Sequence, residues 1–286
     1  MKLINKKQNQ NIQPKVWLYV DMEGINNISL WNQVNPACKE YAKNTKKLTK
    51  EVNAAIKGFC DGGVEEVKLN DLHWFYDNLI IKKLHKKAFP NIGPSLNIPK
   101  FFKEDFDVVG VVGMHAMAGT KNAILAHTWY LPSYIESIKH DGKFIGEIGM
   151  IKFLAEEKGV PVIFISGDKA GCNEAQKTLP KIFTAITKEK DSNKINCLSE
   201  RKSNRLVRQK SKEAILNFIQ SSKKYKKAKT SNKPIEVVFA TKNLTDLIEQ
   251  RCKLKKLKHN RIDAITIEFR GKKFSEILLN FFSVLD

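Results

Sequence analysis

The chain contains little arginine. Only six of its 50 Lys and Arg residues are Arg, and none occurs before residue 201. Arg is the side chain best suited to bidentate binding of guanine edges and phosphates, so its scarcity argues against base-specific recognition. We therefore expect no nucleic-acid partner, although the formal net charge of the 286 residues is +20.

The sequence also lacks paired cysteines and long apolar runs. Its five cysteines, at positions 38, 60, 172, 197 and 252, form no C-x-x-C motif, which excludes a thiolate zinc site and a disulfide framework. The first apolar run, residues 16–20, is too short for a signal peptide or a membrane span. We therefore expect a cytoplasmic protein with no membrane partner, in which residues 1–14 form a flexible extension.

Most of the positive charge lies in one region. Residues 201–261 hold 19 Lys and Arg against four Asp and Glu. A run of lysines is usually a solvated surface. The alternative that stays open is a basic polyanion-binding protein on a degenerate enzyme scaffold.

Short apolar runs alternate with segments of helical periodicity, which predicts an α/β fold with a mixed, mainly parallel sheet and flanking helices. The expected strands are 16–20, 64–69, 107–112 and 160–165, and the expected helices are 37–60, 78–87 and 146–158, with a hairpin turn at 140–143. Beyond these we expect a basic helix at 201–220, strands at 235–240 and 262–269, and a helix at 274–282. This pattern suggests a catalytic domain at 15–185 and a smaller, basic α/β domain at 186–286.

Acidic and imidazole side chains follow the predicted strands. Asp21 and Glu23 come directly after the first strand and, by the alternation of strand side chains, share one face. His73 follows the second strand and His115 the third. Ligands of open α/β sheets bind beyond the carboxyl ends of the strands, so these groups are expected to meet.

Two further residues join this set. Glu147 stands at the start of a predicted helix, and His127 follows His115 by twelve positions. Carboxylates and imidazoles suit Zn²⁺, Mn²⁺ or Co²⁺. There are five candidate ligands without His127, and five ligands with one bridging carboxylate suit two ions. Two such ions polarise a carbonyl or phosphoryl oxygen and activate water, so the pattern indicates metal-assisted hydrolysis of an unspecified substrate.

Each of these residues has a simpler explanation when taken alone. A D-x-E sequence at a strand end is often a solvated turn, a single His is often structural, and Glu147 suits the first turn of any helix. Their coincidence at strand ends is what favours a metal site.

The sequence resembles the D-aminopeptidase family of dinuclear zinc metallopeptidases, the type encoded with bacterial dipeptide-transport operons. The stretches that carry the resemblance occur in the family's order over about residues 16–200: VDMEGI (20–25), NDLH (70–73), DNLI (77–80), VGMHA (112–116), LAHT (125–128), GEIGM (146–150), PVIFISGD (161–168) and NCLS (196–199). One departure is Lys169, where the family often has an acid; another is the strongly basic 201–261 region.

The resemblance implies a function and a role for each residue. It implies release of N-terminal D-amino acids from short peptides such as D-Ala-D-Ala, in a homo-oligomeric ring-stacked decamer of α/β chains. It implies two zinc ions, with Asp21 contacting both and His127 as the catalytic residue, described as the nucleophile. On physical grounds a general base or an oxyanion donor stays open for His127. The zinc ligands it implies are Asp21, Glu23, His73, His115 and Glu147.

Two alternatives to this function stay open. One is a dinuclear hydrolase of another amide or of a phosphoester, because ligands alone do not name what is cut. The other is the polyanion-binding protein, although the Lys and Arg clusters of residues 223–261 contain few aromatic residues on which bases could stack.

Overall fold

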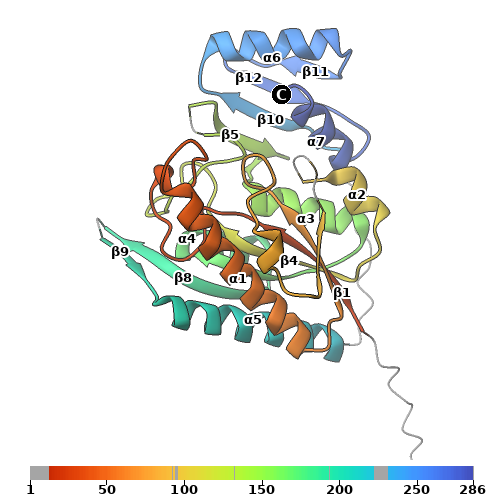
Figure 1. Ribbon diagram of the computed structural model, residues 1–286. Helices are drawn as coiled ribbons and strands as arrows, with labels where there is room; N and C mark the ends of the chain where they lie inside the picture. The colour runs from red at the N-terminus through yellow and green to blue at the C-terminus, as the bar shows by residue number, and fades with distance from the viewer. Residues whose placement is uncertain are drawn as a thin grey trace, which may run out of the picture.

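A seven-stranded sheet forms the centre of the larger part of the chain (Figure 1). The computed structural model describes residues 13–285 except 92, 94–95, 132, 193 and 222–230. The sequence-predicted extension, residues 1–14, therefore lies almost wholly outside the described residues. The strands of the sheet, in spatial order, are β3 (Ala88–Asn91), β2 (Glu66–Asp71), β1 (Lys15–Val20), β4 (Val108–Met114), β7 (Val162–Asp168), β8 (Phe183–Asp191) and β9 (Lys194–Cys197).

All neighbours in this sheet are parallel except β8 and β9. This confirms the expected mixed, mainly parallel sheet. Strand β1 lies between β2 and β4, so the carboxyl ends of these three strands are adjacent. That adjacency positions the residues that follow each strand at one edge of the sheet.

The side chains of β1 alternate between two buried layers. Val16, Leu18 and Val20 pack in a core shared with α1 (Tyr41–Asp61) and α5 (Glu200–Gln220). Trp17 and Tyr19 pack on the opposite face in a core shared with α2 (Ile98–Lys103) and α3 (Glu147–Lys158). Because both faces are covered, the strand is continuously apolar, as is typical of parallel sheets.

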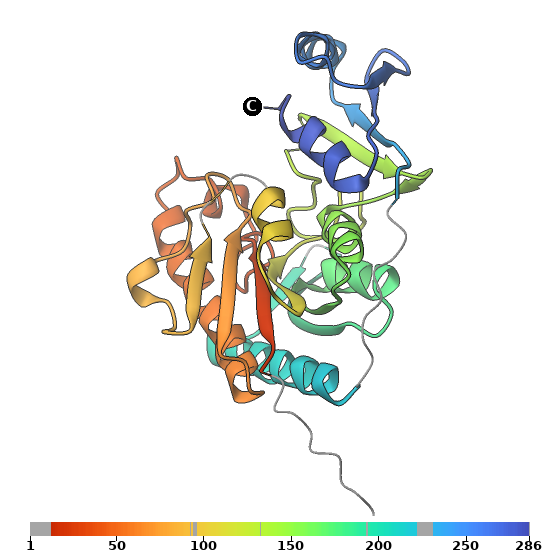
Figure 2. The same ribbon diagram turned by 90° about the vertical axis from the view of Figure 1, so that its right-hand side faces the viewer.

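A second sheet is fully antiparallel and packs beyond α3 (Figures 1 and 2). The hairpin of β5 (Ile135–His140) and β6 (Lys143–Phe144) turns through Asp141 and Gly142, both with positive φ, which confirms the predicted turn. Helix α4 (Lys169–Thr178) follows β7 in the larger unit, whereas α6 (Lys242–Leu254) and α7 (Phe274–Phe282) accompany the second sheet. The strands of this sheet, in order, are β11 (His259–Arg261), β12 (Thr266–Phe269), β10 (Ile235–Phe239), β5 (Ile135–His140) and β6 (Lys143–Phe144).

Two sequence-based elements differ from the structure. The helix expected at 78–87 is wrong: the segment holds a short 3₁₀ turn, η2 (Ile81–Lys83), before β3. Its ends are fixed in a loop because Asp71 accepts the Asn78 N–H and Asn53 accepts the His85 N–H. The strand expected at 262–269 is shorter: β12 covers only its last four residues, and residues 262–265 form a turn after β11 in which Asp263 accepts the Ile265 N–H.

The two sheets divide the chain in a different way from the sequence-based boundary between residues 185 and 186. Strand β8 runs through that boundary within the larger sheet, and β5 and β6 belong to the smaller sheet although they precede it. The domain limits of 15–185 and 186–286 stay a prediction. Among the helices of the described ranges, none is both long and apolar enough to cross a membrane.

The chain leaving β1 crosses tightly over the end of β4. Gly24 donates to the carbonyl of Gly113 at 2.7 Å. A Cβ on Gly113 would lie 2.0 Å from the carbonyl oxygen of Asp21, and Gly113 has φ of +80°. Only glycine fits there, because both the backbone conformation and the space exclude a side chain.

We predict that Gly113→Ala destabilises the fold far more than Gly119→Ala. Gly119 also has positive φ, +77°, but a Cβ added there would have nothing within 4 Å of it. Gly119→Ala should therefore cost only the left-handed backbone penalty, about 1–2 kcal/mol, whereas Gly113→Ala adds overpacking of about 1–3 kcal/mol or more. Urea unfolding of both variants measures this, and equal losses would contradict the tight crossing.

Candidate metal centre

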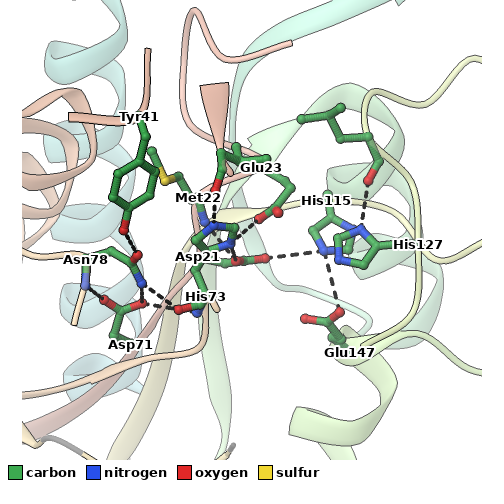
Figure 3. A network of polar contacts seen from close by, with 12 residues as sticks. Asp21, Met22, Glu23, Tyr41, Asp71, His73, Asn78, His115, His127 and Glu147 are labelled. Carbon is green, nitrogen blue, oxygen red and sulfur yellow. Dashed lines mark hydrogen bonds and ion pairs between the residues drawn. The ribbon is translucent and has the colours of Figure 1, made fainter. Parts of the chain in front are cut away.

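Six buried polar side chains meet at the carboxyl edge of the larger sheet (Figure 3). Two follow β1, one follows β2, one follows β4, one begins α3 and one lies in the loop between β4 and β5. Their exposed fractions are between 2% and 8%. They are the six residues expected from the sequence: Asp21, Glu23, His73, His115, His127 and Glu147.

Asp21, Glu23 and His73 form one group whose candidate ligand atoms lie within 4.8 Å of one another. The Nδ1 atom of His73 is 3.0 Å from Glu23 Oε2 and 3.6 Å from Asp21 Oδ1. The bend and turn that follow β1 therefore direct both carboxylates to the imidazole that follows β2.

His115, His127 and Glu147 form a second group within the same limit. The Nε2 atom of His115 is 3.5 Å from Glu147 Oε1 and 3.3 Å from Asp21 Oδ2. Asp21 thus presents one oxygen to each group. This is the geometry of a carboxylate that could contact two ions.

The histidine rings are oriented by main-chain carbonyls. His73 donates from Nε2 to the carbonyl of Val34 at 2.7 Å, and His115 donates from Nδ1 to that of Ala116 at 2.9 Å. His127 donates from Nδ1 to the carbonyl of Leu125 at 2.9 Å. Each bond leaves the other ring nitrogen directed at the site, as in the outer contacts of metal-binding histidines.

The electrostatics of the site favour positive charge. Burial alone would raise the pKa of Asp21, but the neighbouring imidazoles of His115 and His73 outweigh it and hold that pKa well below its usual range. Burial opposes protonation of the two imidazoles, yet the neighbouring carboxylates raise the pKa of His73 and of His115 well above normal. In the described part of the chain, three atoms facing the centre have no hydrogen-bond partner: Asp21 Oδ2, Glu23 Oε2 and His115 Nε2. Metal ions would satisfy them, and the oxygen and nitrogen donors suit zinc.

His127 differs from the other two histidines in its surroundings. Its ring stacks on His115, with centroids 4.1 Å apart. The half-exposed Trp31 ring packs on it in a T-shaped arrangement, with centroids 5.4 Å apart. Burial, and then the charge of His115, lower the pKa of His127. A neutral ring with a free Nε2 can accept a proton from water and, once protonated, can donate it to a substrate.

A set of polar residues that the sequence did not single out holds the His73 loop. Asp71 accepts the His73 N–H at 3.1 Å and the Asn78 N–H at 2.7 Å, and Tyr41 donates to the Asn78 side chain. Burial raises the pKa of Asp71 to about 6. Asp71 and Asn78 occur within the NDLH and DNLI stretches, which was the only signal that could have revealed them.

Strained backbone flanks both histidine loops. Trp74 and Tyr76, after His73, have φ of 47° and 64°, and Leu125 and Trp129, beside His127, have φ of 54° and 69°. Non-glycine residues keep such conformations only where the surrounding contacts impose them, and they gather at functional sites. One such contact is the Trp129 N–H, which donates to Glu147 Oε1 at 2.9 Å.

Glu51 of α1 lies behind the loop that carries Glu23. It accepts the Asn26 N–H at 3.1 Å, and the hydroxyls of Ser166 and Ser203 lie at 3.4 Å. Burial raises the pKa of Glu51 to about 7, although these hydrogen bonds and the charge of Lys188 act against the rise.

Between about pH 4.5 and pH 7, we predict that the wild type loses stability as the pH rises and that Glu51→Gln does not show this loss. In this range Glu51 ionises in the unfolded chain before it does so in the folded one, so wild-type stability falls as the pH rises. The free energy of unfolding of the variant minus that of the wild type should rise by about 3 kcal/mol from pH 4.5 to pH 8. Denaturant titrations at both pH values measure it, and a constant difference would show that Glu51 titrates normally.

Comparison with known proteins agrees with this geometry. The chain is 29% identical over 209 residues to the D-aminopeptidase of Bacillus subtilis (strain 168), an alignment that covers 71% of this chain and 74% of that protein. Its fold matches the solved Zn-dependent D-aminopeptidase DppA from Bacillus subtilis, a self-compartmentalizing protease, with a TM-score of 0.82, 24% identity, and coverage of 95% and 96% of the two chains. The family model of peptidase family M55, D-aminopeptidase, matches residues 15–282. The chain belongs to the D-aminopeptidase family.

Proposed function

We propose that this chain is a metal-dependent aminopeptidase that holds two zinc ions and removes N-terminal D-amino acids from short peptides. The observation that carries the proposal is the pair of ligand groups that share Asp21, with partnerless donor atoms facing the space between them. Membership of the D-aminopeptidase family supports the substrate class, and the solved relative described as Zn-dependent supports the choice of metal.

The proposed ligands divide between the two ions. Asp21, Glu23 and His73 would hold one ion, and His115 and Glu147, with the second oxygen of Asp21, would hold the other. Bound zinc supplies Lewis acidity for the scissile carbonyl and lowers the pKa of water. The carbonyl-bonded imidazoles and the Trp129 N–H on Glu147 keep these donors oriented before substrate arrives.

We assign His127 to the substrate rather than to a metal. Burial lowers its pKa, which favours a neutral ring whose Nε2 can take a proton. In this position it serves peptide hydrolysis as a general base, or donates a hydrogen bond to the oxyanion after taking that proton.

Metal content and stereoselective hydrolysis test the function together. The purified protein should contain two zinc ions per chain and should hydrolyse D-Ala-D-Ala in preference to L-Ala-L-Ala. Asp21→Ala and His115→Ala should each lose at least one ion and most activity, because a missing ligand typically leaves a zinc site incomplete. Elemental analysis and a ninhydrin assay provide the readouts, with His85→Ala as the control outside the centre.

Two results would overturn this function. Absence of bound metal from the purified wild-type protein would rule out the proposed metal centre. Two bound ions with equal cleavage of both enantiomers, or with cleavage of phosphoesters or acylated amines instead, would keep the centre and change the substrate.

A separate prediction concerns His127. His127→Ala should keep two zinc ions and lose turnover by about 10²–10⁴-fold, the usual contribution of a positioned proton-transfer group. Metal analysis beside kcat for D-Ala-D-Ala measures both quantities. Loss of an ion in this variant would make His127 a ligand and contradict its assignment to the substrate.

We also propose that the protein is a cytoplasmic homo-oligomer. The solved relative is described as self-compartmentalizing, and the five cysteines are free thiols. The decamer implied by the family would carry ten charges of +20, so bound anions or salt would have to screen the repulsion.

A further inference from the structure

A buried lysine lies under the proposed metal centre without belonging to it. Lys188, on β8, is among the largest fully buried side chains of the protein. Its ammonium group donates to the main-chain carbonyls of Glu23 and Ile28, which are 165 and 160 residues away in sequence. Lys188 therefore joins β8 directly to the loop that carries a proposed zinc ligand.

This loop has few regular hydrogen bonds of its own. Residues 21–28 connect β1 to the segment before α1 through successive turns rather than through a strand or helix. Buried carbonyls in such a loop need donors from elsewhere, because an unsatisfied buried polar group costs about 1–3 kcal/mol. Lys188 supplies donors to two of them at once.

Other contacts to the same loop come from β8, from the residue that follows β9 and from α1. The Asn26 side chain donates to the Leu198 carbonyl at 2.8 Å, and the Thr187 hydroxyl lies 3.5 Å from the Gly24 carbonyl. The Asn26 N–H donates to Glu51. Among these contacts only Lys188 binds the main chain of Glu23 itself.

The burial of a full positive charge needs an explanation. Moving an ammonium ion out of water costs several kcal/mol, and an apolar side chain of similar size would fill the same space without that cost. The carboxylates of Asp168 and Glu51 offset part of it electrostatically. What an apolar residue could not provide is the pair of hydrogen bonds to the loop.

We propose that Lys188 is a positioning residue that aims the Glu23 carboxylate at the metal bound by Asp21, Glu23 and His73. This inference rests on the metal-binding part of the proposed function. Lys188 acts through the main chain of Glu23 and does not contact His115 or Glu147, which are held by separate contacts to Ala116 and Trp129. Its removal should therefore affect one ion and spare the other.

The test is the affinity for each zinc ion in Lys188→Met. Outer contacts of metal ligands typically contribute about 10–100-fold in metal affinity, so one of the two stepwise affinities should fall by about that factor and the other should stay within about threefold. Competition with a chromophoric chelator measures both steps. Lys190→Met, two residues along the same strand, is the matched control and should bind both ions as the wild type does.

A double-mutant cycle separates positioning from general destabilisation. In a Glu23→Ala background the carboxylate to be aimed is gone, so adding Lys188→Met should change neither affinity by more than about threefold. If Lys188→Met weakens both ions alike, or weakens binding equally with and without Glu23, Lys188 is only structural and the inference fails. If Lys188→Met does not fold, Lys188→Gln, which keeps an uncharged donor on a side chain one bond shorter, takes the same measurements. A smaller selective loss is then expected, and an equal loss of both ions would overturn the inference.

The outcome for the wild type distinguishes this inference from the proposed function. If the wild type binds no zinc, both the proposed function and this inference are wrong. If the wild type binds two ions and Lys188→Met binds both as tightly as the wild type does, the proposed function stands and only the role of Lys188 is wrong.

Discussion

The mutual burial of Asp21, Glu23 and Glu147 against His73 and His115 is the constraint on which the rest of the structure depends. Three carboxylates with almost no exposure to water are costly unless cations compensate them. The protein accepts this cost at one edge of its sheet and supports it with directed contacts. Carbonyls fix the rings, a main-chain N–H fixes Glu147, and three atoms remain free for metal.

The sheet makes this arrangement possible because β1 lies between β2 and β4. Parallel neighbours bring their carboxyl ends to one edge, where Asp21, His73 and His115 emerge side by side. The glycine crossing lets the chain beyond β1 approach β4 closely enough for Asp21 to face both ligand groups. Lys188 of β8 and Glu51 of α1 hold the same loop, so the centre is supported by elements distant from it in sequence.

The local sequence pattern predicted the ligands at the strand ends, but it did not predict the elements that hold those ligands in place. Asp21 and Glu23 follow an uninterrupted apolar strand directly, so their place at its carboxyl end could be predicted, although a turn rather than strand alternation orients them. The order of the stretches around His73, His115 and Glu147 indicated the family. Strand β8 escaped prediction because Lys188 is polar yet buried, which breaks the apolar pattern that identifies a buried strand. The pairing of β5 with β10 joins segments nearly a hundred residues apart, which no local periodicity encodes. The helix expected at 78–87 was wrong because the Asn78 and His85 N–H groups donate to Asp71 and Asn53 instead of to helical carbonyls.

The most direct test of the central claim is anomalous diffraction at the zinc absorption edge from crystals of the purified protein. Two peaks should appear about 3.5–4 Å apart, one against Glu23 and His73 and the other against His115 and Glu147, with Asp21 between them. A single peak away from Asp21, or none within the cluster, would contradict a shared dinuclear centre.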